Sequence, residues 1–456
     1  MRHFWVLALI TVCLVPSVVA DEPPNIIYIM LDDAGYGDFG AFGSKKVKTP
    51  TFDLMCAEGM KFTQHYSGSC VCAPTRCVLM TGMHTGHCRR RDNAAKGLKK
   101  QLSATNGRPL VFLEDKDVTV AESLQEAGYK TAGIGKWGLG NPGFDGAPEK
   151  QGFDYWYGYL DQVHAHNHFP DKIWDGGKMV AIPGNANNGR KVYIPYRQEE
   201  KALEFVRANK DEKFFLYLAL TPPHGAYEIP TDDPVYAQYD HLSGIVRHYA
   251  AMITRTDQTV GKVMALLKEL KLDEETIVFF TSDNGPNPPF IKPLNSAGGL
   301  RGGKRDLFEG GLRAAMVARW PGKIAAGTTS DFVWDMRDVF PTACELAGIK
   351  TPSHLDGMSV MPTLMGKQQT GRKFHYWEFY SPFQQAVRMG DWKGIRFGTE
   401  EPIMLFNLAN DERETKNVAA SNPEIVNQLA KVMTDSHVES KYFPSKAHGK
   451  PRSRSE

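Results

Sequence analysis

The sequence has few cysteines, almost no net charge and no long apolar run after its first twenty residues, and each shortage excludes a class of protein. Seven cysteines in 456 residues are too few for a fold built on disulfides, although one or two bridges would suit an oxidising compartment. With 54 basic and 52 acidic side chains, the net charge of +2 gives no electrostatic basis for binding nucleic acid. No later segment is apolar enough to cross a bilayer, so we expect a globular chain with a large core.

The first twenty residues predict an export signal. A short basic start and an apolar stretch lead to short side chains ending at Ala20, after which we expect cleavage. A retained membrane anchor is disfavoured because Pro16 interrupts a short apolar run, and the residues before Cys13 match a lipid-attachment site poorly. We therefore expect residues 1–20 to be removed from a periplasmic or secreted protein. The basic segment 448–456 is typical of a frayed tail.

Strand-like and helix-like segments alternate along most of the chain. The apolar runs at 25–31, 213–220 and 276–282 are typical of strands buried on both faces of a parallel sheet. Helical segments lie between such runs, and the one that follows Thr119 begins with a capping box completed by Glu122. The pattern predicts an α/β fold with a large, mostly parallel sheet flanked by helices.

The pattern changes near residue 370. Short antiparallel strands and a last helix near 422–434 predict a small C-terminal α+β subdomain over 372–447, after a main domain over 21–371. The segments 137–196 and 284–311 are rich in glycine, proline and asparagine, so we expect long loops there.

Polar residues follow several of the predicted strands. Asp32 and Asp33 end the first apolar run, Asp283 and Asn284 follow another, and His224 lies in a turn after a third. Ligands bind at the carboxyl ends of strands in open α/β sheets, and these oxygens suit Ca²⁺ or Mg²⁺. Either pair alone could simply cap a turn, but two pairs at strand ends favour a metal site.

Three cations occur near the same predicted edge. Lys136 and Lys304 lie in glycine-rich segments, and Arg76 follows the cysteine cluster. A single lysine is most often a solvated surface charge. A metal, three cations and His224 together suggest the handling of a phosphate or sulfate ester.

The stretch SGSCVCAPTRCVLMTG crowds three cysteines together, but only Cys72 is followed by Ala-Pro-Thr-Arg. Pro74 suits the first turn of a helix, which places Cys72 at a helix N-terminus, where negative charge is favoured. That position suits a reactive nucleophile. A buried structural thiol is one alternative. A zinc site with Cys70 and Cys77 is another, but it lacks the usual paired spacing.

With these residues assembled, the chain resembles the type I sulfatases of the alkaline-phosphatase-like superfamily over nearly all of its mature length. The resemblance rests on seven segments in order: IIYIMLDDAGYGD, CAPTR, GKWGLG, TPPHG, TSDNG, FEGGLRAAMVARWPG and LFNLANDERETKNVA. It implies hydrolysis of sulfate monoesters by a domain at 21–371. The long aromatic loops suit a sulfated carbohydrate, although another small sulfated molecule remains open.

The resemblance also implies how the site is built. Cys72 would be oxidised to formylglycine by a formylglycine-generating enzyme, and its hydrated aldehyde would present an oxygen nucleophile. One divalent cation, calcium rather than magnesium, would be held by Asp32, Asp33, Asp283, Asn284 and an oxygen of modified Cys72. Arg76 would position the hydrated aldehyde. The sulfate group would contact Lys136, Lys304 and His224, the last also meeting the ester oxygen.

Two positions depart from the family pattern. Gly138 stands where the family often has a histidine that acts as a base, and we expect His166 to compensate, rather than His164 or His168 in the same segment. Met83 stands where the pattern usually continues Thr-Gly-Arg, so one supporting cation is missing. Two other functions stay open: a phosphoester or phosphonate hydrolase of the same superfamily, and a non-catalytic binding protein that keeps its thiol.

Overall fold

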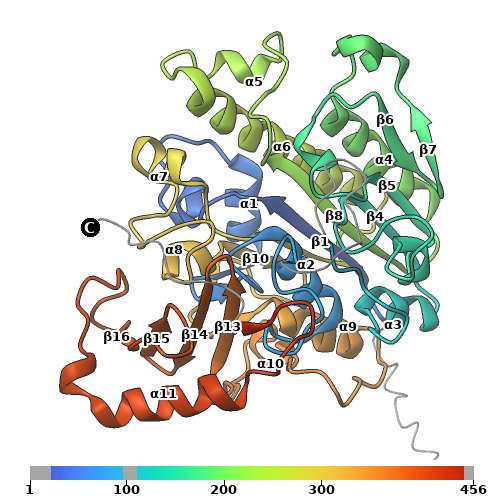
Figure 1. Ribbon diagram of the computed structural model, residues 1–456. Coiled ribbons are helices and arrows are strands. Elements are labelled where there is room, and N and C mark those ends of the chain that lie inside the picture. Colours follow the sequence, from blue (N-terminus) through green and yellow to red (C-terminus); the bar gives the residue numbers. More distant parts are fainter. Residues whose placement is uncertain (1–21, 96–109, 446–456) are drawn as a thin grey trace, which may run out of the picture.

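The computed structural model describes residues 22–95 and 110–445 (Figure 1). The expected export signal and the basic tail therefore lie outside the described residues. Among the helices of the described part, none combines the length and apolar character needed to cross a membrane.

A ten-stranded mixed sheet forms the centre of the molecule, in the order β11-β2-β10-β9-β1-β8-β4-β5-β6-β7. Its central strands run parallel: β9 (Thr276–Ser282), β1 (Asn25–Asp32), β8 (Phe214–Pro223), β4 (Lys130–Lys136) and β5 (Tyr155–Tyr159). Antiparallel pairs extend it through β10 (Met316–Arg319) to β2 (Met60–Phe62), and through β6 (Lys172–Asp175) to β7 (Lys178–Ala181). The edge strand β11 (Thr328–Ser330) pairs parallel with β2.

Helices cover both faces of the sheet because the central strands are apolar on both. Every residue of β1 is buried. Ile27 and Ile29 share one cluster with α1 (Pro50–Glu58), α4 (Ile194–Ala208) and α6 (Gly244–Glu269). Tyr28 and Met30 point to the opposite face, toward α2 (Cys72–Thr81), α3 (Val120–Glu126) and α9 (Val339–Leu346).

The capping box predicted at Thr119 is present, with Glu122 as its partner. The expectation of a long loop at 137–196 is wrong, because this segment supplies β5, β6 and β7. The aromatic run YWYGY forms β5, where Trp156 is buried, so packing against the sheet outweighs the glycine content around it. The segment 284–311 also contains α7 (Pro288–Leu294) and the start of α8 (Glu309–Leu312).

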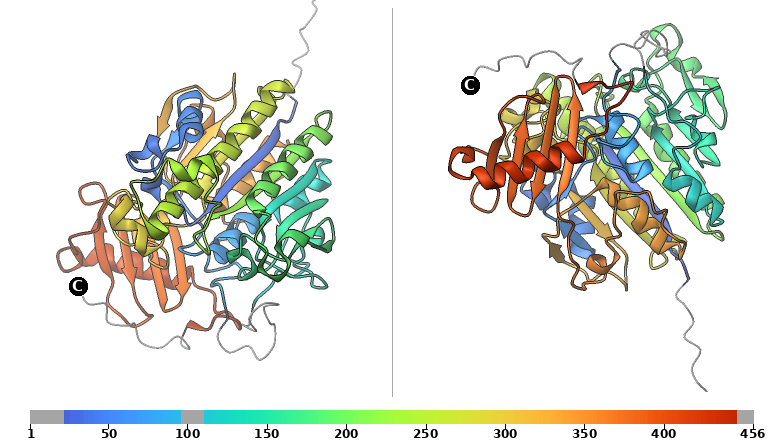
Figure 2. Two further views of the ribbon diagram at one scale, coloured as in Figure 1. Left: turned by 90° about the horizontal axis from the view of Figure 1, so that it is seen from above. Right: turned by 60° about the horizontal axis from the view of Figure 1, so that its bottom comes forward.

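The C-terminal part is a four-stranded antiparallel sheet with α11 (Pro423–Asp435) lying across it (Figure 2). Its strands are β13 (His375–Tyr380), β14 (Phe383–Met389), β15 (Trp392–Arg396) and β16 (Met404–Asn407). Buried Lys393 joins it to the main sheet domain through an ion pair with Glu309 at 2.8 Å, and also pairs with Glu414 of the C-terminal part at 2.9 Å. Short elements complete the structure: β3 (His65–Tyr66), β12 (Trp334–Asp335), α5 (Pro234–Ala237) and α10 (Met361–Leu364).

Candidate active site

The carboxyl ends of β1 and β9 bring three carboxylates together. Because these strands pair in parallel, with Leu31 opposite Ser282, the residues that follow them lie side by side. Asp32 ends β1, and Asp33 follows with a φ of 70°, a conformation that aspartate tolerates better than most residues. The N–H of Asp33 donates to Oδ1 of Asp283 at 3.1 Å. One oxygen from each of these three aspartates lies within 4.8 Å of the others.

Two buried oxygens of this group have no hydrogen-bond partner among the described residues: Oδ1 of Asp32 and Oδ1 of Asn284. The amide nitrogen of Asn284 donates to Oδ1 of Asp33 at 2.7 Å, which leaves the Asn284 carbonyl oxygen for another partner. Burial raises the pKa of Asp283 to about 7, and the charge of Asp32 adds to the shift. A divalent cation would relieve both the repulsion and the missing contacts, so this donor set fits a hard metal ion.

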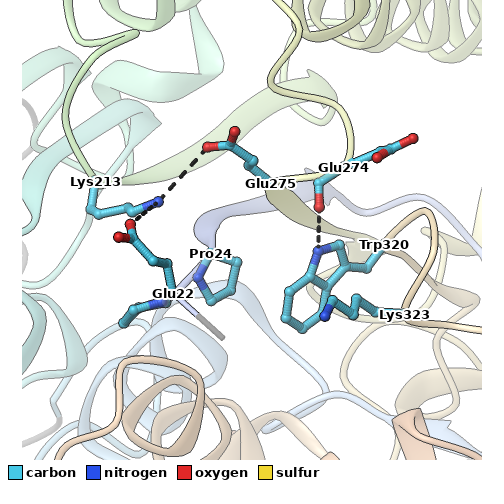
Figure 3. Close-up of a pocket in the computed structure, with 8 residues that line it drawn as sticks. Glu22, Pro24, Lys213, Glu274, Glu275, Trp320 and Lys323 are labelled. Atoms are coloured by element: carbon cyan, nitrogen blue, oxygen red, sulfur yellow. Dashed lines mark hydrogen bonds and ion pairs between the residues drawn. The ribbon is translucent and has the colours of Figure 1, made fainter. Parts of the chain in front are cut away.

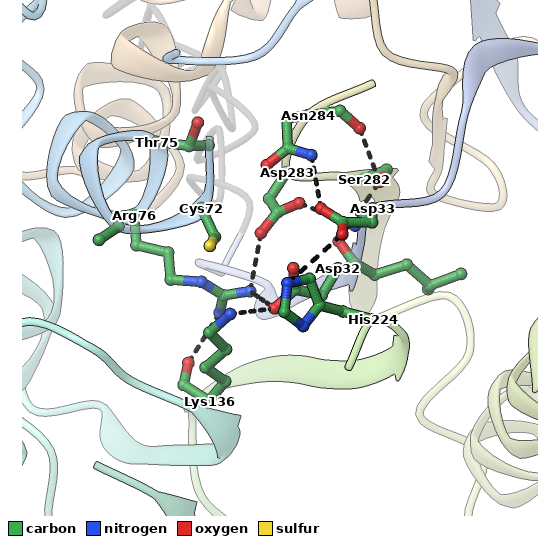
Figure 4. Close-up of polar contacts among 12 residues, drawn as sticks. Asp32, Asp33, Cys72, Thr75, Arg76, Lys136, His224, Ser282, Asp283 and Asn284 are labelled. Carbon is green, nitrogen blue, oxygen red and sulfur yellow. Dashed lines mark hydrogen bonds and ion pairs between the residues drawn. The ribbon is translucent and has the colours of Figure 1, made fainter. Parts of the chain in front are cut away.

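Arg76 and Lys136 bring positive charge to the carboxylates (Figure 4). Nη2 of Arg76 lies 3.3 Å from Oδ2 of Asp32 and 3.0 Å from Oδ2 of Asp283. Lys136, the last residue of β4, forms an ion pair with Asp32. Burial alone would raise the pKa of Asp32, but the charges of Lys136 and Arg76 help to hold it well below its usual value.

Lys304 and His224 meet at Asp33. Nζ of Lys304 lies 2.8 Å from the Asp33 carboxylate, and Nε2 of His224 lies 3.4 Å from its Oδ2. Burial, reinforced by the charge of Lys304, lowers the pKa of His224 well below its usual value. The Nδ1 atom of His224 has no hydrogen-bond partner among the described residues. The imidazole is therefore neutral here and has an unused polar atom.

Cys72 is the first residue of α2, as the position of Pro74 predicted. Figure 4 shows its thiol pointing toward the guanidinium of Arg76 and the carboxylates. The Cys72 sulfur, an Asp32 oxygen and a His224 nitrogen lie within 4.8 Å of one another. The helix N-terminus and the cations create a setting that favours an anion or a nucleophile at this side chain.

Of the three histidines in the segment 164–168, only His166 faces His224, with ring centroids 4.4 Å apart. Nε2 of His168 contacts the backbone carbonyl of His224 at 2.9 Å and so stabilises the turn that carries His224. His164 packs edge-on against Tyr159. Burial, with a contribution from the charge of Lys136, lowers the pKa of His166 to about 4, which leaves the imidazole neutral near neutral pH.

Gly138 follows β4 with a φ of 82°, and the space of a side chain there is taken by Gln162. A Cβ atom at Gly138 would lie 1.7 Å from Nε2 of Gln162. Both polar side-chain atoms of Gln162 are buried and have no hydrogen-bond partner within the described part of the chain. The departure at Gly138 is therefore matched by a side chain from another loop, which no sequence motif indicates.

Sequence reasoning missed two residues beside Cys72. The side-chain amide of Asn93 lies against the sulfur of Cys72, with Nδ2 at 3.6 Å. Arg90 is 1% exposed and donates from its guanidinium to the backbone carbonyl of Asn93 at 2.8 Å. In the sequence these two belong to the stretch RRRDN, whose charge pattern suggests only a solvated surface.

A hollow of about 280 Å³ opens at the amino ends of the central strands, on the side of the sheet away from the acidic cluster (Figure 3). Pro24, just before β1, lines it with Lys213, Glu275 and Trp320. Lys213 pairs with Glu275 at 3.8 Å across its wall. Because it lies at the amino ends of the strands, away from the acidic cluster, it is not the active site.

The comparisons with known proteins agree with this geometry. The family model described as Sulfatase matches residues 24–349, and the model described as N-sulphoglucosamine sulphohydrolase, C-terminal, matches residues 302–439. The chain belongs to the sulfatase family. It is 34% identical to N-acetylgalactosamine-6-sulfatase of Canis lupus familiaris, covering 82% of this chain and 72% of that protein. It is 31% identical to human arylsulfatase A, covering 91% of this chain and 88% of that protein.

Among solved structures, the sulfatase superposes on Ps i-CgsB in complex with k-i-k-neocarrahexaose with a TM-score of 0.80 and 27% identity. That match covers 93% of this chain and 96% of the other. The family and fold predictions are thus confirmed: the protein is a type I sulfatase of the alkaline-phosphatase-like superfamily, an enzyme that hydrolyses sulfate esters. The rival zinc site is not found among the clusters of the described residues, and all six described cysteines are free thiols.

Proposed function

We propose that this sulfatase removes sulfate from a sulfated carbohydrate with residue 72 in its formylglycine form. The observation that carries the proposal is the position of Cys72: it begins α2, and its sulfur, an Asp32 oxygen and a His224 nitrogen lie within 4.8 Å of one another. The sulfur marks where an oxygen of the hydrated aldehyde would lie. A formylglycine-generating enzyme would act on the cysteine before the mature site is complete.

The metal ligands we propose are the oxygens of Asp32, Asp33, Asp283, Asn284 and modified residue 72. Several carboxylates gathered in a buried site favour calcium, with magnesium as the alternative. When bound, the ion would neutralise charge on the sulfate group and favour ionisation of a nearby hydroxyl.

The three cations bind and orient the reacting groups, and one histidine supplies a proton. Arg76 orients residue 72, while the ammonium groups of Lys136 and Lys304 bind sulfate oxygens. His224 protonates the leaving oxygen, since a bound anionic sulfate would raise the pKa that burial lowers in the structure. His224→Ala should therefore slow release of a poor alcohol leaving group more than release of 4-nitrophenolate, which needs no proton. Equal slowing of both substrates would contradict this role.

Turnover depends on the second hydroxyl of the hydrated aldehyde. One hydroxyl would give up its proton to solvent and attack sulfur while the bond from sulfur to the ester oxygen breaks, and the alcohol would leave with a proton from His224. The second hydroxyl would then lose its proton, the electrons of its O–H bond would form the carbonyl bond, and the bond from carbon to the sulfated oxygen would break and release sulfate. His166 is our candidate to accept that proton, because its neutral ring faces the site and Gly138 has no side chain.

A carbohydrate substrate is supported by two independent features. One relative is named N-acetylgalactosamine-6-sulfatase, and a structural neighbour was solved in complex with k-i-k-neocarrahexaose. The segment 155–174 adds His166, whose ring centroid lies 4.4 Å from that of His224 and which can hydrogen-bond a sugar, whereas Trp156 and Tyr159 of the same segment are buried in the core. Export to the periplasm or beyond fits such a substrate. The domain boundaries at 21–371 and 372–447 stay predictions.

The direct test compares matched esters. Purified protein should hydrolyse 4-nitrophenyl sulfate and release sulfate from sulfated galactose or N-acetylgalactosamine oligosaccharides, with far lower activity on 4-nitrophenyl phosphate. A preference for the phosphate or for a phosphonate ester would favour the alternative hydrolase, whose structural relative, a phosphonate monoester hydrolase, is 19% identical and supports only the fold. Absence of all hydrolysis by protein that keeps an unmodified thiol at Cys72, when produced with a formylglycine-generating enzyme, would favour the binding protein.

A further inference from the structure

The N-terminus of α2 is capped from a distant loop. Val71, the residue before the helix, makes no side-chain cap, so the first amide groups of the helix need other partners. Oδ1 of Asn93 accepts from the N–H of Ala73 at 3.0 Å. This contact fixes the orientation of the amide and leaves Nδ2 of Asn93 3.6 Å from the sulfur of Cys72.

Arg90 fixes the loop that carries Asn93. Its guanidinium donates to the carbonyl oxygens of Asn93 at 2.8 Å, Val111 at 3.3 Å and Gly138. Arg90 is 1% exposed, and burial lowers its pKa to about 10, so it is still a cation at neutral pH. A buried cation therefore joins the loop beside residue 72 to the glycine at which the family pattern is interrupted.

Arg90 is related to both positions that depart from the family pattern, Met83 and Gly138. Met83, in the place of the usual arginine, packs against the apolar cluster around α2 and brings no charge. Arg90 supplies a cation from later in the chain, and it reaches Gly138 as well.

We propose that Asn93 is a catalytic residue whose Nδ2 donates a hydrogen bond to an oxygen of modified residue 72, and that Arg90 is its positioning residue. This inference rests on the proposed formylglycine function. The amide donates to the oxygen on which negative charge develops when the hydroxyl proton leaves, and it stays in place because Ala73 holds its other end. A hydrogen bond to a charged oxygen is worth about 1.5–3 kcal/mol, which corresponds to a loss of about 10- to 100-fold in kcat when it is removed.

The test compares Asn93→Ala with Asn93→Asp. An aspartate keeps an oxygen that accepts from Ala73 but has no N–H to donate, so it separates a structural cap from a catalytic donor. We expect both variants to lose about 10- to 100-fold in kcat on 4-nitrophenyl sulfate, with little change in KM. Asn417→Asp is the matched control, because Oδ1 of Asn417 also accepts a backbone N–H, from Leu405 at 3.0 Å, in the C-terminal sheet. It should keep the wild-type kcat.

Maturation is separated from catalysis in two ways. The formylglycine content of each preparation is measured by mass spectrometry, and rates are expressed per modified chain. In a Cys72→Ser background no modification is needed, and transfer of sulfate to the introduced hydroxyl is followed as a single mass change. Adding Asn93→Ala should slow that transfer as well.

Three outcomes would overturn the inference while wild-type protein is active: wild-type kcat in Asn93→Ala, recovery of kcat in Asn93→Asp, or unchanged sulfate transfer in the serine background. An inactive wild-type protein that carries formylglycine would instead refute the proposed function. Arg90→Lys tests the positioning role, with kcat expected to fall between those of wild type and Asn93→Ala. Wild-type kcat in Arg90→Lys together with wild-type kcat in Arg90→Gln would remove Arg90 from the proposal.

Discussion

Replacement of Lys304 by methionine should separate catalysis from stability. Methionine keeps most of the volume of the side chain but removes the charge that contacts Asp33 at 2.8 Å. Asp33 would keep three other partners: the amide of Asn284 at 2.7 Å, the amide of Asn287 at 2.6 Å and His224 at 3.4 Å. The carboxylate is therefore not left unpaired, and the loss in unfolding free energy should stay below the roughly 3–5 kcal/mol typical of a broken buried pair.

The cost to catalysis should be larger. One preorganised donor to a developing charge is worth about 3–4 kcal/mol, so kcat/KM should fall by about 10²- to 10³-fold. The assay is hydrolysis of 4-nitrophenyl sulfate, with urea unfolding of the same preparation. Lys393→Met is the contrast: Lys393 pairs with Glu309 and Glu414 outside the site, so this variant should lose stability and keep kcat in its folded fraction. A stable Lys304→Met enzyme with wild-type kcat/KM would refute the assignment of Lys304 to the sulfate.

Three further predictions follow from the buried groups. Gly138→Ala should lower the unfolding free energy by about 1–3 kcal/mol, because the new Cβ would lie 1.7 Å from Nε2 of Gln162. Adding Gln162→Gly to the same chain should restore part of that loss. If urea unfolding showed that the effects of the two substitutions simply add, the crowding would be contradicted. His166→Ala should lower kcat throughout the range of about pH 5–8 and should lack the decline that the wild type shows on acidification as His166 takes up a proton; an unchanged pH profile of kcat would exclude the base role. His65 packs on Trp334, and burial lowers its pKa to about 3. Between about pH 3 and about pH 6.5 the unfolded chain therefore binds more protons than the folded chain, so the unfolding free energy falls on acidification. His65→Phe should reduce the slope of unfolding free energy against pH by up to about 1.4 kcal/mol per unit, and an equal slope in both proteins would disprove it.

The features predicted from sequence are those set by local patterns. The apolar runs that form β1, β8 and β9 are continuous, and the polar residues that follow them necessarily reach one edge of a parallel sheet. The start of α2 at Cys72 followed from the restricted backbone of Pro74. Local patterns alone therefore predicted that the candidate metal ligands and cations lie near the carboxyl ends of the strands and that Cys72 lies at a helix N-terminus.

The rest depends on contacts between distant segments, which no local pattern encodes. Gln162 fills the space at Gly138 only because the loop after β5 returns over the end of β4. Asn93 lies beside residue 72 in a loop whose Arg90 donates to carbonyl oxygens of Asn93, Val111 and Gly138, which are contacts that join separate segments. The strands β6 and β7 pair at the edge of the sheet in a segment whose composition resembles a loop.

The proposed mechanism requires that residue 72 is a formylglycine in the active enzyme. Trypsin should release residues 62–76 as one peptide, which contains both Cys70 and Cys72. After unfolding and thiol alkylation of active enzyme, we predict that this peptide carries one alkyl group, on Cys70, and the mass of an aldehyde at position 72. A peptide that carries two alkyl groups in fully active enzyme would show that Cys72 keeps its thiol and would exclude formylglycine as the nucleophile.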